Sequence, residues 1–99
     1  MSKAIPADLG EDMPVVWIPA SLRALTNQRE SIRVDGQTVR EVIDHLELQF
    51  PGIKARLCEG DSLRRGLAVA IDAEVSRTGL DQSVPENSEV HFLPAIGGG

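Results

Sequence analysis

Residues 38–50 limit the possible folds of this chain more than any other segment, because they have the pattern of a capped amphipathic helix. Apolar residues recur there at helical spacing, at Val39, Val42, Ile43, Leu46 and Phe50. Thr38 followed by Glu41 fits a capping box, in which each side chain binds a backbone N–H at the start of the helix. Pro51 and Gly52 end the pattern. Such an apolar stripe has to be buried, and the strands predicted around it offer an apolar sheet face.

Four segments have the composition of β-strands: VVWIP from Val15, SIRVD from Ser31, LAVAID from Leu67 and EVHFLP from Glu89. In the third, Leu67 and Val69 share one face with Ile71, and we expect the opposite face, with Ala68 and Ala70, to be partly exposed. The predicted order is strand, strand, helix, strand, turns, strand, with a helical turn possible over residues 53–57 before a charged loop.

The last strand is predicted to place Val90 and Phe92 on one face and Glu89 and His91 on the other. Pro94 has no N–H to donate, so we expect it to end the ladder. The turn-rich segment before this strand is expected to reach the core at three residues, Val75, Leu80 and Val84.

The 99 residues suit one domain, which we divide into a loose leader over 1–13, a domain over 14–95 and a flexible tail over 96–99. A net charge of -5 and only three aromatic residues oppose nucleic-acid binding. The sequence has no signal peptide and no membrane span, and its lone Cys58 cannot form an intrachain disulfide, so we expect a cytoplasmic protein.

No motif for catalysis, metal binding or a bound cofactor is present. Cys58 has no base tied to it by a motif, since the only histidines are His45 and His91, and we interpret it as structural or incidental. Both histidines are expected at the surface.

The chain ends in three glycines that follow an apolar strand through Pro94, Ala95 and Ile96. Terminal glycines alone favour an inert, disordered end or a linker. The functional alternative is that Gly97–Gly99 thread a narrow channel of a partner, since residues 95–99 reach roughly 17 Å when extended. The terminal carboxylate is a poor electrophile, so acyl transfer from it requires activation by that partner.

The terminus VHFLPAIGGG, preceded by GLDQSVPENSE and by a capped helix that follows a hairpin, resembles that of the ubiquitin-like sulfur carriers of the MoaD and ThiS group, and within it the CysO-like carriers. The resemblance covers residues 14–99. It implies an α+β, β-grasp (ubiquitin-like) fold: a mixed four- to five-stranded sheet packed on one main helix, with the first and last strands side by side. The pair before the last strand, usually Gly-Asp, is Asn87-Ser88 here, and Asn tolerates the positive φ of such a turn.

The resemblance also implies a mechanism and partners. An E1-like enzyme that uses ATP adenylates the carboxylate of Gly99, beside Gly98, and converts it to a thiocarboxylate. A sulfur-accepting enzyme then takes the sulfur, either a cysteine-synthase-like enzyme or the large subunit of molybdopterin synthase, and a JAMM-type peptidase is a further partner. The residues implied in contact with the activating enzyme are Phe92, Leu93, Pro94, Ala95, Ile96 and Gly97, although Phe92 equally suits the core. The alternatives are a ubiquitin-like modifier conjugated to lysines and an interaction domain with an inert tail.

Overall fold

The computed structural model describes residues 13–95 of the chain, and its main helix is α1 (Val39–Gln49). The Thr38 hydroxyl accepts a hydrogen bond from the Glu41 N–H at 3.2 Å, as the capping box predicts. The return bond differs, because the Glu41 carboxylate accepts from the N–H of Gln37 at 2.8 Å, one residue before the cap. The helix ends before Pro51 and Gly52, as expected.

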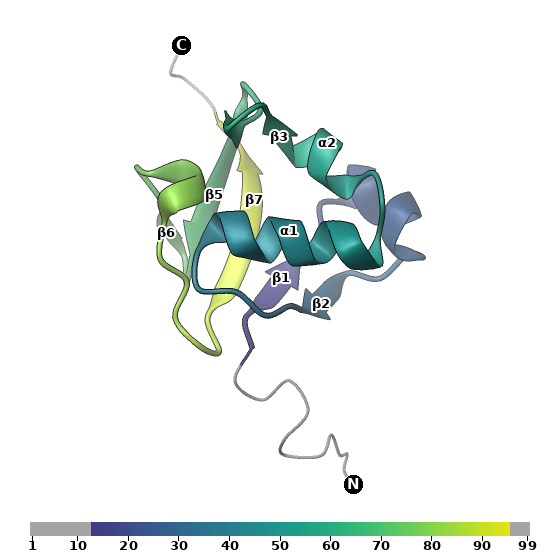
Figure 1. Cartoon of the computed structure of the whole chain (residues 1–99), viewed down its shortest axis with the longest axis horizontal. Coiled ribbons are helices and arrows are strands. Elements are labelled where there is room, and N and C mark those ends of the chain that lie inside the picture. Colours follow the sequence, from purple (N-terminus) through teal and green to yellow (C-terminus); the bar gives the residue numbers. More distant parts are fainter. Residues whose placement is uncertain (1–12, 96–99) are drawn as a thin grey trace, which may run out of the picture.

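A mixed five-stranded sheet lies behind α1, in the order β2-β1-β7-β5-β6 (Figure 1). The strands are β1 (Val15–Trp17), β2 (Ser31–Arg33), β5 (Leu67–Ile71), β6 (Glu74–Val75) and β7 (Glu89–Pro94). β1 runs parallel to β7, while the other neighbouring pairs are antiparallel. The predicted sheet is therefore confirmed, with the first and last strands side by side.

Shorter elements complete the chain. The connection between β1 and β2 contains the 3-10 helix η1 (Ala20–Thr26), and α2 (Ile53–Leu57) follows α1 as the sequence predicts. The charged loop after α2 holds a small hairpin of β3 (Cys58–Glu59) and β4 (Ser62–Leu63). A second 3-10 helix, η2 (Gly79–Asp81), packs against α1 near β6 (Figure 1). None of the helices within residues 13–95 is long and apolar enough to cross a membrane.

The hydrophobic core fills the space between α1 and the sheet. The apolar stripe of α1 is buried there, with Val39, Val42, Ile43 and Leu46 fully covered. The sheet contributes the residues that alternate toward the helix, namely Val16, Ile32, Val69, Ile71, Val90 and Phe92. Helix and strand periodicities therefore meet in one core, as the sequence predicts.

Two details differ from the sequence predictions. Val75 is 60% exposed and does not reach the core, although Leu80 and Val84 do. Ala70 is buried and not partly exposed, because β7 and β6 flank it in the sheet. Pro94 ends the ladder as predicted, since it is the last residue of β7 and pairs with Leu67, and the Ala95 N–H still donates to the carbonyl oxygen of Gly66 at 2.9 Å.

The turn between β5 and β6 allows a test of this fold. Asp72 and Ala73 form its two-residue loop and both have positive φ, 51° and 75°. Such a loop favours Gly at its second position. We expect Ala73→Gly to raise the free energy of unfolding by about 0.5 to 1 kcal/mol, since the relief of left-handed strain exceeds the entropy that Gly adds to the unfolded chain.

The matched control is Ala55→Gly, the same exchange at an exposed site of α2 with ordinary helical geometry. It is expected to lower the free energy of unfolding by about 0.5 to 1 kcal/mol. Urea titrations followed by fluorescence of Trp17 measure both. Equal destabilisation by the two variants would contradict the loop geometry.

Candidate functional site

The candidate site is the place where the chain leaves the sheet after β7. This strand lies between β1 and β5, so it is paired on both sides. Its last residue, Pro94, pairs with Leu67, and the Ala95 N–H bond to Gly66 fixes the following residue as well. The sheet therefore holds Pro94 and Ala95 in one position, and we call these two residues the root of the terminal segment. The predicted roles of Ile96, Gly97, Gly98 and Gly99 concern residues outside the described range.

The four described residues of the predicted partner contact differ in exposure. Phe92 is 7% exposed and belongs to the hydrophobic core, which is the alternative that its strand position left open. Leu93 lies half-buried on the opposite face of the sheet, and Pro94 and Ala95 are exposed. A partner that docks at the root can thus contact Leu93, Pro94 and Ala95 directly, whereas Phe92 lies in the core beneath them.

The start of β7 is also fixed. Asn87 has a φ of 64°, as its place in the turn predicts, and the Ser88 N–H donates to the carbonyl oxygen of Pro85 at 3.2 Å. The buried Ser88 hydroxyl donates to the same oxygen at 2.6 Å, and the Asp72 carboxylate accepts from the Glu89 N–H at 2.8 Å. Hydrogen bonds thus anchor the strand at the end opposite the terminal segment.

The face of the sheet opposite α1 carries an aromatic pair beside β7. The rings of Trp17 and His91 stack with centroids 5.7 Å apart and planes 6° apart, and the indole N–H of Trp17 donates to the Glu89 carboxylate at 3.2 Å. Both rings are half-buried, so neither is part of the core. An aromatic surface of this kind suits a protein interface.

The strand register extends this surface across the sheet. His91 pairs with Ala70, which pairs with the exposed Val75, and Leu93 pairs with Ala68 in the next row. We call Trp17, Ala68, Val75, His91 and Leu93 the open-face patch. Most of this patch has no signal in the sequence, because alternation within a strand assigns faces but only the pairing register brings residues of separate strands together.

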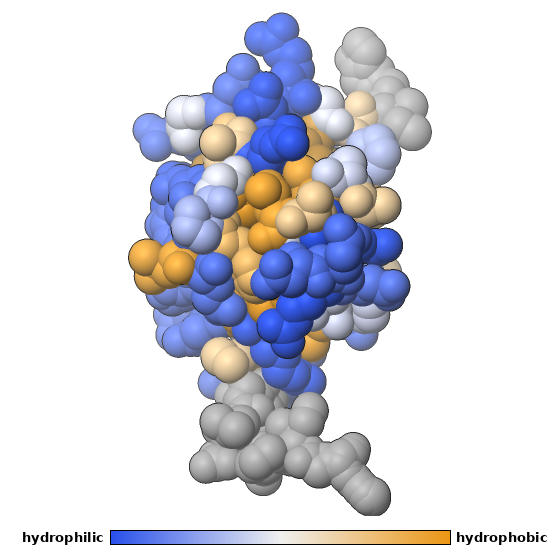
Figure 2. Space-filling model, turned by 90° about the vertical axis from the view of Figure 1, so that its right-hand side faces the viewer, coloured by the Kyte–Doolittle hydropathy of each residue, from blue (hydrophilic) through white to orange (hydrophobic). Residues whose placement is uncertain are grey.

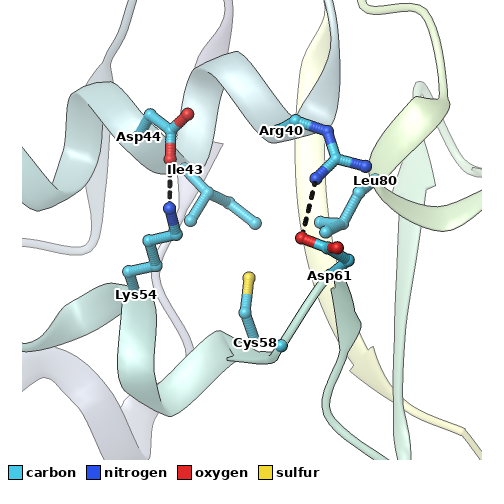
Figure 3. Close-up of a pocket in the computed structure, with 8 residues that line it drawn as sticks. Arg40, Ile43, Asp44, Lys54, Cys58, Asp61 and Leu80 are labelled. Atoms are coloured by element: carbon cyan, nitrogen blue, oxygen red, sulfur yellow. Dashed lines mark hydrogen bonds and ion pairs between the residues drawn. The ribbon is translucent and has the colours of Figure 1, made fainter.

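A small pocket of about 70 Å³ lies between α1 and the β3–β4 hairpin and contains the thiol of Cys58 (Figure 3). The Lys54 ammonium lies 2.6 Å from the Asp44 carboxylate at this pocket, and Arg40 lies 3.9 Å from Asp61. Burial raises the pKa of the Cys58 thiol, which opposes thiolate formation. The residues that line the pocket include no histidine, and the geometry fits the structural role predicted for Cys58.

The rest of the described surface offers no second centre of reactive groups. Figure 2 shows apolar side chains gathered in the middle of one side, surrounded by hydrophilic residues. Within residues 13–95, no three His, Cys, Asp or Glu residues are grouped so that they could hold a metal ion. His45 binds the backbone oxygen of Asp35 at 2.7 Å and thus links α1 to the preceding turn.

Comparisons with known proteins agree with this arrangement. The ThiS family matches residues 16–99. The sulfur carrier protein CysO of Mycobacterium tuberculosis is 34% identical over 89 residues, which cover 85% of this chain and 96% of that protein. A chain in the crystal structure of the Amycolatopsis orientalis BexX/CysO complex has a TM-score of 0.79 and 38% identity, and the match covers 87% of this chain and 99% of that one.

A more distant similarity supports the fold alone. Small archaeal modifier protein 1 from Methanosarcina acetivorans has a TM-score of 0.71 at 23% identity, and the match covers 89% of this chain and 97% of that one. Together these similarities confirm the predicted β-grasp fold.

The two faces of β7 predict different effects of mutation. We expect Phe92→Ala to lower the free energy of unfolding by about 3 to 5 kcal/mol, because it leaves a cavity in the core. Leu93→Ala is expected to cost less than about 1 kcal/mol, since the side chain is half-exposed on the open face. Urea unfolding measures both variants. A Leu93→Ala loss as large as that of Phe92→Ala would show that the open face is packed.

Proposed function

Since the chain belongs to the ThiS family of ubiquitin-like sulfur carriers, we propose that it carries sulfur on the carboxyl group of Gly99. The observation that supports this most directly is the position of β7, which fixes the exposed Pro94 and Ala95, with only Ile96 between them and the three glycines. The family match extends through those glycines to residue 99. The chain acts as a carrier that partner enzymes load and unload, and it is not itself the catalyst.

The proposed loading has two steps, both in the site of an E1-like enzyme. A carboxylate oxygen of Gly99 attacks the α-phosphate of ATP, and pyrophosphate leaves. A sulfur nucleophile of the enzyme's sulfur source then attacks the carbonyl carbon, and AMP leaves with the electron pair of the broken C–O bond. If the nucleophile is sulfide, loss of AMP gives the thiocarboxylate directly. If it is a persulfide, a second thiol attacks the outer sulfur of the source, forms a disulfide with it and releases the thiocarboxylate, whose sulfur is a nucleophile. Gly97 and Gly98 have no side chain to obstruct either attack.

The proposed acceptor is an enzyme of cysteine biosynthesis, because the identified relatives include the sulfur carrier CysO at 34% identity. In this route a cysteine-synthase-like enzyme receives the sulfur and a JAMM-type peptidase releases the product. Molybdenum-cofactor synthesis, with a molybdopterin-synthase large subunit as acceptor, is the alternative route. Both place the protein in the cytoplasm with its partners.

Conjugation to lysines, as in a ubiquitin-like modifier, uses the same activated terminus and ends in an isopeptide bond. Isopeptide-linked conjugates in cell extract would favour that function. An inert tail would leave partner binding unchanged when Gly98 and Gly99 are removed.

We expect the protein, purified from a host that contains its activating enzyme, to show in intact-mass spectra the exchange of one oxygen for sulfur at Gly99. The Gly99→Val variant should lose this exchange, because a branched side chain crowds the carbonyl carbon. Leu48→Ala, at a side chain that is 79% exposed on α1, is the control and should retain it. If the wild type stays unmodified with cognate enzyme and ATP present, sulfur loading at Gly99 is contradicted.

Leu93 provides a test of the partner contact next to the root. We expect Leu93→Arg to lower kcat/KM for adenylation about tenfold or more, because an apolar contact is replaced by a charge that the enzyme does not pair. Leu48→Arg is the matched control, with the same new charge on the helix face. Pyrophosphate release measures both. An equal effect of the two variants would place the enzyme contact elsewhere.

A further inference from the structure

An activated carbonyl at Gly99 is open to attack by any accessible amine or thiolate, including those of other copies of this chain. The inference below rests on the proposed function. Arginine is no acceptor in such a reaction, because its guanidinium does not lose a proton in proteins. Of the ten Lys and Arg residues of the sequence, only Lys3 and Lys54 are lysines, and Cys58 is the only cysteine. Lys54 and Cys58 are thus the only such lysine and thiol within residues 13–95.

The structure engages the Lys54 amine in an ion pair. Its ammonium Nζ donates to the Asp44 carboxylate at 2.6 Å, and about half of each side chain is covered. The backbone N–H of Lys54 donates to the Glu47 carboxylate at 2.9 Å, which fixes the residue at the start of α2. The hydrogen bond to Asp44 raises the pKa of the Lys54 ammonium, so less of the reactive neutral amine is present at a given pH.

Burial limits the access of other molecules to the thiol of Cys58. Cys58 is 8% exposed, and it lines the same pocket as Lys54 (Figure 3). Cys58 also borders a larger, open depression of about 350 Å³ together with Glu47 and Ala55, so its protection depends on the small exposed fraction of its own side chain and not on the size of the pocket. Little of the Cys58 side chain is therefore open to an acyl group from another copy.

We propose that Asp44 and the burial of Cys58 limit self-conjugation at residues 13–95, by holding Lys54 as a paired ammonium and by leaving little of the Cys58 side chain open to incoming acyl groups. Asp44 is a positioning residue in this role, since it acts through Lys54. This surface suits a carrier whose activated Gly99 carbonyl reacts with a sulfur nucleophile. It disfavours the isopeptide-linked chains that a modifier with many lysines forms.

The reaction that this arrangement suppresses is ordinary aminolysis. The lone pair of a neutral Lys54 Nζ forms a C–N bond with the Gly99 carbonyl carbon, and the bond from that carbon to the leaving group breaks. The leaving group takes the electron pair, and the amine proton passes to water. Protonation of Nζ removes the lone pair, which is why an ion pair that favours the ammonium slows the step.

The test uses the full chain with a thioester installed chemically at Gly99, so it needs no activating enzyme. All variants carry Lys3→Arg, which removes the second lysine. At mildly alkaline pH we expect this background to lose its thioester mainly by hydrolysis, with little Gly99–Lys54 dimer. Asp44→Ala should raise the rate of this isopeptide formation about two- to fivefold, the range that an exposed ion pair supports. Ala favours the helix, so α1 is retained.

Two controls define the outcome. Arg77→Lys introduces an amine at an exposed site and should be acylated faster than Lys54, while Asp44→Ala combined with Lys54→Arg should return dimer formation to the background. Peptide mapping of the dimers by mass spectrometry separates linkage at Lys54, at the new lysine, at Cys58 and at the α-amino group. Circular dichroism confirms that each variant is folded.

The proposal is overturned if Asp44→Ala leaves the rate at Lys54 unchanged, if Lys54 reacts in the background as fast as the lysine of Arg77→Lys, or if Cys58 is acylated in the folded background. Failure of the proposed function would appear separately, as the absence of sulfur at Gly99 when the cognate enzyme and ATP are supplied, and would leave these rates unaffected.

Discussion

The pairing of β7 on both of its edges is the constraint on which the rest of the structure depends. β1 holds it in parallel from Glu89 to His91, and β5 holds it in antiparallel from Val90 to Pro94. Val90 and Phe92 point from this strand into the core beneath α1. A strand paired on both sides and buried on one face cannot slip by one residue without exposing its apolar side chains. The point at which the chain leaves the sheet is therefore fixed by the whole fold.

The approach of α1 to the sheet depends on one glycine. A Cβ at Gly36 would lie 2.7 Å from Val42 Cγ2 and 2.8 Å from the Val42 backbone nitrogen, and the φ of Gly36 is 152°. The chain can turn from β2 into α1 at this distance only because Gly36 has no side chain. Backbone bonds from Val39 to Gln82 and from Val84 to Gln37 then tie the helix start to the segment that leads into β7. The start of α1 and the segment that leads into β7 are thus held by the same contacts.

Local patterns in the sequence are enough to predict the elements whose determining pattern spans only a few neighbouring residues. The Thr38 cap, the apolar stripe of α1 and the alternation in β7 depend on spacing along the chain, and all were predicted. Val75 was assigned to the core because it is apolar, but its strand neighbours turn it to the open face. The Trp17–His91 stack joins residues that are distant in sequence, and it follows only from the register of β1 against β7. Long-range pairing of this kind leaves no local signal.

The fixed root also determines where recognition can occur. The four residues beyond Ala95 span at most about 14 Å even when fully extended, so an enzyme that holds the Gly99 carbonyl must come close to the end of β7. Glycine offers no side chain by which one carrier can be told from another, and specificity must then come from what lies beside the channel entrance. Pro94 and Ala95 are exposed there, and Leu93 connects them to Trp17 and His91 on the open face. Under the proposed function, these fixed residues beside the glycines, and not the glycines themselves, would then let a partner enzyme distinguish this carrier from others.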